Sequence, residues 1–395
     1  MIKDWTILTK NAKFICVSNF FWNMGRTFPH SILTIFLLSQ GISIANIAML
    51  QTVYMIVSMI TEFPSGVIAD RFSRKIIYLV SVFLIFISYL LIGFYSDNFT
   101  ILVVAYGLYG LSMSFKSGTL DAEIVLEYKK ENLDIKNYSI VFSYINQLSS
   151  ILGGLLGGFM YAYISQNIYV ISSVLFVTSF FAACLTSFEK VETDEVKNNS
   201  SILAELKTGH QILKDTKILV YILGLYSVTM LFVQPFFQYW QVLYQTHEIK
   251  VEYFGIIYVL FQVCTMIGTA IYKRLNINQS INNGIMILIP VLFSLGYAVP
   301  NGFVITLPIS VILFFTFYQH LDVILKTHAP TQYISSFFSL TGTVVNFAAA
   351  ISLFIMAFFI QQFGIHLAYI IMFSLYSIST IVIYNLLIKP PISIK

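Results

Sequence analysis

Ionisable side chains lie inside long apolar stretches of this 395-residue chain, among them Arg26, Glu62, Lys116 and Asp121. A charged side chain near the centre of a membrane helix costs about 2.5–3.5 kcal/mol on insertion scales, so it usually faces a cavity or a partner. An acid that alternates between pairing with a cation and binding a proton would couple solute movement to a proton gradient. Asp121 and Glu62 are candidates for this role as counter-charges of Arg26. A permanent ion pair between two helices is the alternative, and the sequence does not choose between them.

Other polar and aromatic residues in the apolar stretches are candidates for contacts with a substrate or with protons. The candidates to line a substrate cavity are Asn23, Arg26, His30, Lys116, Gln234, Gln238, Trp240 and Tyr318. The candidates to exchange protons are Asp121, Glu62, Asp322 and His320. His320 and Asp322 are two positions apart and therefore point to different faces of one helix. Asp322 also has Lys326 one turn away as a balancing charge.

Membrane-spanning helices must position these residues, because the chain is 57% hydrophobic and only 10% charged. Soluble domains carry about 25% charged residues. Apolar stretches near 20 residues cross a bilayer core of roughly 30 Å, and twelve of them follow one another. We expect spans at 14–38, 44–66, 76–95, 100–126, 138–162, 168–188, 218–244, 252–272, 284–299, 303–325, 333–361 and 365–388.

The basic residues orient these spans. With a cytoplasmic N-terminus, only Lys250, Arg26 and Lys116 fall outside the segments expected on the inner side. Short loops with such a bias fix the orientation of a membrane protein by the positive-inside rule. We therefore expect a multi-pass protein of the plasma (inner) membrane with both termini in the cytoplasm. The many Ile, Lys and Asn residues indicate a bacterial source.

A polar stretch at 189–217 divides the chain into two halves of six spans, 1–188 and 218–395. Ile202, Leu206 and Leu213 have helical spacing within it, which predicts a short amphipathic helix on the cytoplasmic surface. The tripeptides at 120–122 (LDA) and 321–323 (LDV) both lie near the inner end of the fourth span of their half. This weak echo agrees with two parallel six-helix repeats.

The segment from Gly66 to Lys75, GVIADRFSRK, follows the second span. It resembles the signature loop G-x-x-x-D-R-x-G-R-K of the major facilitator superfamily, with Ser73 in place of the usual glycine. The resemblance implies a charge latch that forms in the outward-facing state and breaks in the inward-facing state, with Asp70 near a helix N-terminus. The switch candidates are Gly66, Asp70, Arg71, Arg74, Lys75 and, as acidic partners of Arg74, Glu123 or Glu127. The alternative is a set of ordinary positive-inside loop charges.

A second resemblance lies in the fifth span, at GGLLGG. It is similar to the antiporter motif G-P-x-x-G-G, with Gly154 where proline is usual, and its glycines are Gly153, Gly154, Gly157 and Gly158. Small residues let helices approach closely, in an antiporter or in ordinary packing. The stretches 61–66 and 117–122 are similar to those of drug-exporter-like members from Gram-positive bacteria. Together these resemblances imply an all-α membrane protein of twelve helices in two six-helix bundles, with helices one, four, seven and ten around a central cavity.

The leading hypothesis is a secondary active transporter that exports small hydrophobic or amphipathic compounds by proton-coupled alternating access. Two alternatives stay open: an uptake symporter for a small solute, an anion being one option, and a lipid or lysolipid flippase of the same fold. A membrane sensor or enzyme is the alternative from another class.

The sequence also predicts what the protein lacks. It has no GxxxxGK[ST] phosphate loop and no metal-ligand spacing, and Cys16, Cys184 and Cys264 lie far apart in apolar runs. We therefore expect no enzyme activity, no cofactor and no metal. We expect a monomer in the lipid bilayer whose ligands are a small-molecule substrate and protons. The net charge of +4 is too small to indicate a nucleic-acid partner.

Overall fold

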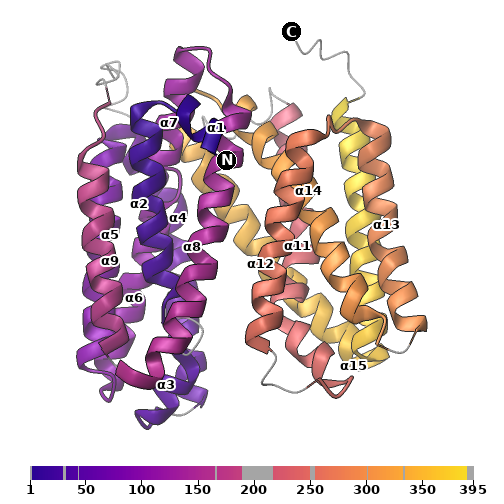
Figure 1. The fold of residues 1–395 in the computed structure, drawn as a ribbon, viewed down its shortest axis with the longest axis horizontal. Helices are drawn as coiled ribbons and strands as arrows, with labels where there is room; N and C mark the ends of the chain where they lie inside the picture. Colours follow the sequence, from indigo (N-terminus) through magenta and orange to yellow (C-terminus); the bar gives the residue numbers. More distant parts are fainter. Residues whose placement is uncertain are drawn as a thin grey trace. The chain divides into compact units, whose positions relative to one another are not determined.

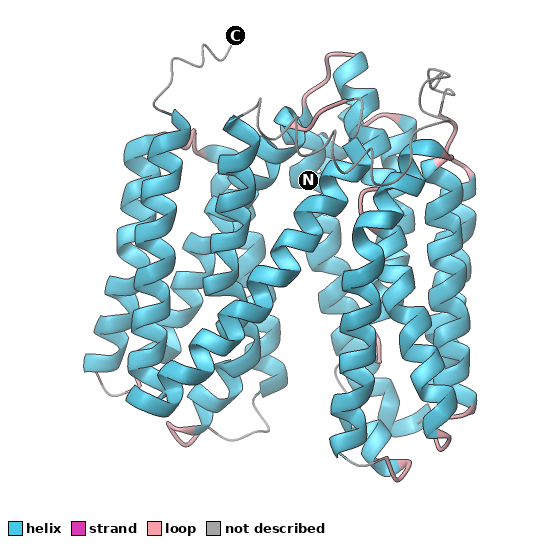
Figure 2. Cartoon of the chain, turned by 180° about the vertical axis from the view of Figure 1, so that it is seen from behind, coloured by secondary structure: helices cyan, strands magenta, loops and turns pink. Residues whose placement is uncertain are grey.

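The structure of the protein is a computed structural model. It describes residues 2–29, 33–42, 44–164, 167–188, 217–249, 254–299, 301–331 and 334–388. Within these ranges the regular secondary structure is helical and contains no strand (Figure 2). The chain forms two compact units: a first unit of Met1–Gly209 with Ala329–Thr343, and a second unit of His210–His328 with Val344–Lys395. The predicted linker helix at 189–217 lies outside the described residues, apart from Lys217.

The helices follow one another in chain order in both units (Figure 1). The first unit contains α1 (Ile2–Ile7), α2 (Lys10–Thr27), α3 (Leu33–Ser39), α4 (Ile44–Arg71), α5 (Arg74–Phe94), α6 (Phe99–Lys116), α7 (Leu120–Lys130), α8 (Ile135–Ile164), α9 (Ile168–Cys184) and the start of α15. The second unit contains α11 (Lys217–Gln245), α12 (Phe254–Arg274), α13 (Gln279–Ala298), α14 (Phe303–His328) and the rest of α15 (Ile334–Ile388).

Each predicted span has a counterpart among these helices. The first span is α2 with α3, the fourth is α6 with α7, and the last two are the parts of α15 before and after Gly364, where the backbone leaves the helical region (φ 77°, ψ 167°). Among the described residues, eight helices are long and apolar enough to cross a membrane, counting α15 once. A ninth, α4, qualifies as a pair bent by 43° near Pro64. The spacing predicts the ninth span from 284, but α13 starts at Gln279, capped by the Asn278 side chain.

Local signals set several helix ends. Ser73 accepts a hydrogen bond from the Ile76 N–H and caps the start of α5, so the serine that departs from the family motif has a structural role here. Asn98 caps α6 in the same way. Gly118 has φ +65°, a conformation that side chains rarely adopt, and it separates α6 from α7. This break turns the fourth span into two helices.

Helix α2 packs between α8 and α9 in the first unit. A Cβ at Gly157 of α8 would overlap the Phe28 carbonyl, and one at Gly153 would overlap the Thr27 hydroxyl. On the α9 side, a Cβ at Gly25 would come within 3.0 Å of the Phe176 ring. Glycines therefore permit the close approach of α2 to both neighbours.

An aromatic stack forms the core of the second unit. The Phe232 ring of α11 stacks on Phe314 of α14 (centroids 4.3 Å apart) and on Phe373 of α15 (4.5 Å). Phe236 continues the stack and meets Phe261 of α12 at 4.8 Å. Because aromatic pairs contribute about 0.5–1.5 kcal/mol beyond their buried area, this stack ties four helices together.

Candidate functional site

The break between α6 and α7 places two opposite charges at one point of the first unit. Lys116 is the last residue of α6, and Asp121 lies in the first turn of α7. Both line a cavity of about 260 Å³. Its other lining residues are Ile15, Asn19, Tyr78, Met113, Ser117, Gly118, Leu120 and Phe142. A carboxyl group and a lysine therefore line one cavity together with apolar side chains.

The Asp121 carboxylate is held from a helix that the sequence did not connect to it. Tyr138 of α8 donates a hydrogen bond from its hydroxyl to Asp121 Oδ1 at 2.6 Å. Asp121 also attracts Lys116 electrostatically. Asp121 therefore interacts with residues of both α6 and α8.

Polar residues of α2 form a stripe that faces α8. Asn19 donates to the Asn146 side chain. Asn23 Nδ2 reaches the Asn146 carbonyl at 2.9 Å and the hydroxyls of Ser149 and Ser150 at 2.8 Å each. These bonds fix Asn23 on one side and leave its Oδ1 to accept from Arg26 Nη2 at 3.3 Å.

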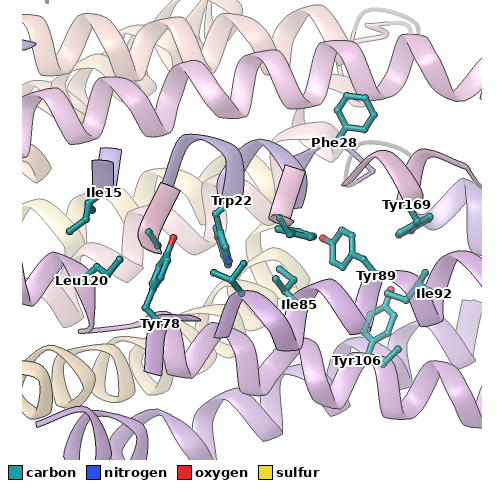
Figure 3. Close-up of a cluster of buried hydrophobic side chains, with 14 of the residues drawn as sticks. Ile15, Trp22, Phe28, Tyr78, Ile85, Tyr89, Ile92, Tyr106, Leu120 and Tyr169 are labelled. Atoms are coloured by element: carbon teal, nitrogen blue, oxygen red, sulfur yellow. The ribbon is translucent and has the colours of Figure 1, made fainter. Parts of the chain in front are cut away.

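Two cations share one indole ring beside this stripe. Lys116 Nζ lies 3.9 Å from the Trp22 ring centroid, and Arg26 Cζ lies 5.9 Å from it. Trp22 is 2% exposed and belongs to the buried cluster that also holds Tyr78 and Tyr89 (Figure 3). Both cations are attracted to the face of the ring, although they repel each other.

Arg26 does not find the acidic partner that the sequence suggested. Among the residues that the structure describes, neither Asp121 nor Glu62 forms an ion pair with it. Its electrostatic neighbours are the tyrosine hydroxyls of positions 54, 89 and 109. The Arg26 Nε and the Trp22 Nε1 are both buried without a hydrogen-bond acceptor. This part of the first unit is therefore rich in donors.

Glu62 accepts a hydrogen bond from Ser117, one of the residues that line the cavity of Lys116 and Asp121. It is 5% exposed, in α4, and a Cβ on Gly342 of α15 would approach its Oε1 to 2.6 Å. The missing side chain at Gly342 makes room for this carboxyl group.

The loop after α4 forms a charge cluster. Arg74 pairs with Asp70 at 2.7 Å and with Glu123 of α7 at 3.3 Å. Lys75 donates to the carbonyls of Cys184 (2.8 Å) and Thr186 (2.6 Å), while Glu127 accepts from Asn11 at 2.8 Å. Gly66 is buried in α4, and Arg71 ends that helix, its side chain lying outside the described ones. Of the two acids suggested for Arg74, the contact is with Glu123.

The candidates of the second unit do not gather at one point. Asp322 pairs with Lys326 at 3.1 Å, one turn away. His320 Nε2 hydrogen-bonds the Tyr384 hydroxyl at 2.9 Å. Trp240 packs on Phe261 (5.4 Å), and Tyr318 on Phe314 (5.8 Å). Gln234 and Gln238 lie on α11, the former half-buried and the latter exposed.

The remaining residues fall into three groups. His30 lies outside the described residues. Gly153 and Gly157 pack against α2, as described above, and Gly154 and Gly158 lie on the same helix. Trp22 and Tyr138 were missed by sequence reasoning. Trp22 stands four residues before Arg26, a spacing that puts both on one helix face, whereas no local signal links Tyr138 to Asp121.

Comparison with known proteins places this geometry in a family. The profile of the Major Facilitator Superfamily matches residues 15–353. None of the curated proteins compared with the chain matches it. A bacterial homologue of the iron transporter ferroportin, solved in an outward-facing state, superposes with a TM-score of 0.74 at 14% identity, covering 95% of this chain and 99% of that one.

A second solved structure has the same fold. The fucose:proton symporter of E. coli gives a TM-score of 0.73 at 14% identity and covers 96% of this chain and 98% of its own. Identities this low speak for the fold alone. They confirm the predicted all-α membrane fold of twelve helices in two six-helix bundles. The chain belongs to the Major Facilitator Superfamily and is a multi-pass membrane transporter of small molecules.

Proposed function

We propose that this chain is a proton-coupled exporter of small amphipathic compounds. The observation that supports this best is the first-unit cavity, where Asp121 and Lys116 stand beside apolar side chains such as Met113 and Phe142. An ionisable pair next to an apolar surface suits both a proton and an amphipathic solute. We place the protein in the plasma membrane of a bacterium, as a monomer with both termini in the cytoplasm.

In this proposal Asp121 is the acid that titrates. While it is ionised, Tyr138 and Lys116 hold it in place. A proton on Asp121 removes its attraction for Lys116 and changes the charge of the cavity by one unit. A solute and a proton that compete for the same cavity would exchange across the membrane.

Helix α7 connects this acid to the charge cluster after α4. Asp121 and Glu123 are both in its first turn, and Glu123 contacts Arg74. A shift of α7 that follows proton binding would therefore reach the Arg74 contacts within two residues. We propose these contacts as the latch that distinguishes the transport states.

We propose export rather than uptake because the glycines of α8 are similar to an antiporter motif. Two alternatives keep the same fold. Uptake of an anionic solute is favoured by the two cations around Trp22, and a fucose:proton symporter shares the fold. Movement of lipids or lysolipids between leaflets is the other.

The test is extrusion of a panel of cationic, neutral and anionic dyes from a pump-deficient bacterium, with and without a protonophore. We expect protonophore-sensitive extrusion that falls about ten-fold or more in Asp121→Asn, the range of a lost proton-transfer group. Asp97→Asn, in an exposed loop, is the matched control and should keep full activity. Extrusion that survives both the protonophore and Asp121→Asn would contradict the proposal, as would uptake of the dyes.

A further inference from the structure

We propose that the substrate is an organic anion whose acidic head binds between Arg26, Lys116 and the Trp22 N–H. The inference rests on the proposed transport function and adds the chemical class of the solute. It comes from the arrangement of donors around Trp22, which none of the family resemblances describes.

Among the described residues Arg26 has no carboxylate in an ion pair with it, whereas Lys116 is attracted by Asp121. Both cations contact the Trp22 ring, at 3.9 Å for Lys116 and 5.9 Å for Arg26. A ring quadrupole attracts a cation but carries no net charge. The two cations repel each other, so an anion that touches both would remove that repulsion.

Asp121 accepts a hydrogen bond from Tyr138 and attracts Lys116, and Glu62 accepts a hydrogen bond from Ser117 and lies against Gly342. The groups that face Arg26 are the amide of Asn23 and the hydroxyls of tyrosines 54, 89 and 109. In the part of the chain that the structure describes, no carboxylate pairs with Arg26, so an acid from outside the chain would meet no competitor there.

Two buried N–H groups of α2, on residues one helical turn apart, lack an acceptor. They are Nε1 of Trp22 and Nε of Arg26. Trp22 is 2% exposed, and a buried donor without an acceptor is unfavourable and uncommon in native proteins. Neither group accepts hydrogen bonds, so the complementary ligand supplies oxygen acceptors. Carboxylate, sulfonate and phosphate esters all meet this requirement.

The neighbouring cavity suits the rest of the molecule. It contains Lys116 and is also lined by Ile15, Met113 and Phe142, with Tyr78 at one side. A volume of about 260 Å³ accommodates a body about the size of a substituted benzene ring or a short alkyl chain. The ligand class is thus a small organic acid with one apolar part.

The experiment is a binding titration of the purified full-length chain that reads Trp22 directly. Trp5→Phe and Trp240→Phe leave Trp22 as the single indole. The probes are benzoate, octanoate, benzenesulfonate and phenyl phosphate, each paired with a neutral or cationic relative such as benzamide, octanamide and benzylamine. We expect Trp22 emission to change with the anions and not with their relatives.

Variants separate the charges from the fold. Arg26→Gln and Lys116→Gln should each weaken anion binding about ten-fold or more, whereas Arg274→Gln, an exposed cation at the end of α12, should not. Arg26→Lys keeps the charge and should recover part of the affinity. Thermal unfolding of each variant reports whether it is folded. Anions should raise the unfolding temperature of the parent protein and of Arg274→Gln, and should raise it less in Arg26→Gln and Lys116→Gln.

The outcomes are separate from those of the proposed function. Equal responses to anions and amides, no response to any anion of the panel, or unchanged affinity in folded Arg26→Gln and Lys116→Gln would overturn the anion inference. Protonophore-sensitive export of neutral or cationic dyes would then leave proton coupling intact. Conversely, selective anion binding together with protonophore-insensitive flux would support the anion site and contradict proton coupling of transport.

Discussion

The two units of this transporter bury different chemistry. The first unit holds charged residues in its interior, with Arg26 and Lys116 around Trp22 and with Asp121 and Glu62 on other helices. The second unit is built around the rings that stack on Phe232. Its described ion pair, Asp322 with Lys326, joins residues one turn apart on one helix. We infer that residues of the first unit bind the proton and the substrate, whereas the interior of the second unit serves mainly for helix packing.

The same close helix packing at a glycine nevertheless occurs in both halves. In the first unit, a Cβ on Gly110 of α6 would approach the Tyr54 carbonyl of α4 to 2.6 Å. In the second, a Cβ on Gly268 of α12 would approach the Ile312 carbonyl of α14 to 2.7 Å. These are the second and fourth spans of each half. Repeated helix packing with different interior residues shows that the fold does not dictate the chemistry.

The largest effect should come from breaking the aromatic stack. Phe232→Ala removes a fully buried ring that contacts four others. We expect a loss of about 3–5 kcal/mol in stability, measured as thermal unfolding in detergent, with the proton dependence of flux retained in the protein that folds. Phe237→Ala, at an exposed neighbouring ring, is the control. A loss of proton dependence in folded Phe232→Ala would show that the second unit shares the coupling chemistry.

A second effect should appear at the contact of α2 and α8. Gly157→Ala forces a Cβ into the Phe28 carbonyl, so helix α2 must shift. We expect a cost of about 1–3 kcal/mol or more from overpacking, read from the same unfolding curves, together with weaker anion binding because α2 carries Arg26. Gly107→Ala has nothing within 4 Å and should be neutral or slightly stabilising. Equal unfolding temperatures of Gly157→Ala and Gly107→Ala would show that α2 and α8 are not closely packed at Gly157.

The smallest effect should be at the histidine pair of the second unit. His247 and His366 share a hydrogen bond between their Nε2 atoms at 2.7 Å, with His247 stacked on Phe303. His366→Ala should cost about 1 kcal/mol, the net worth of one such bond, and leave anion binding unchanged. His328→Ala, whose Nδ1 contacts the Ile324 carbonyl of its own helix at 2.9 Å, serves for comparison. A large loss of transport in His366→Ala would give the second unit a functional role that its packing does not suggest.

The sequence predicted the fold well, because long apolar runs report directly on membrane spans. It also predicted that Arg74 contacts an acid of the fourth span, since the motif and the topology bring that loop to the end of that span. The site itself was harder. Lys116 meets Trp22, and Asp121 meets Tyr138, across different helices. Such contacts depend on the rotation of each helix, which apolar periodicity leaves undefined in a span that is hydrophobic all round.

The glycine seam between α2 and α8 also bears on how this protein could acquire new substrates. Because backbone groups meet at Gly153 and Gly157, the seam tolerates no added atoms. Random libraries selected for altered preference should therefore return changes at Met113, Lys116 or Phe142, which line the cavity, and leave the seam untouched. Substrate specificity would therefore change through the cavity side chains, while the packing of α2 on α8 stays the same.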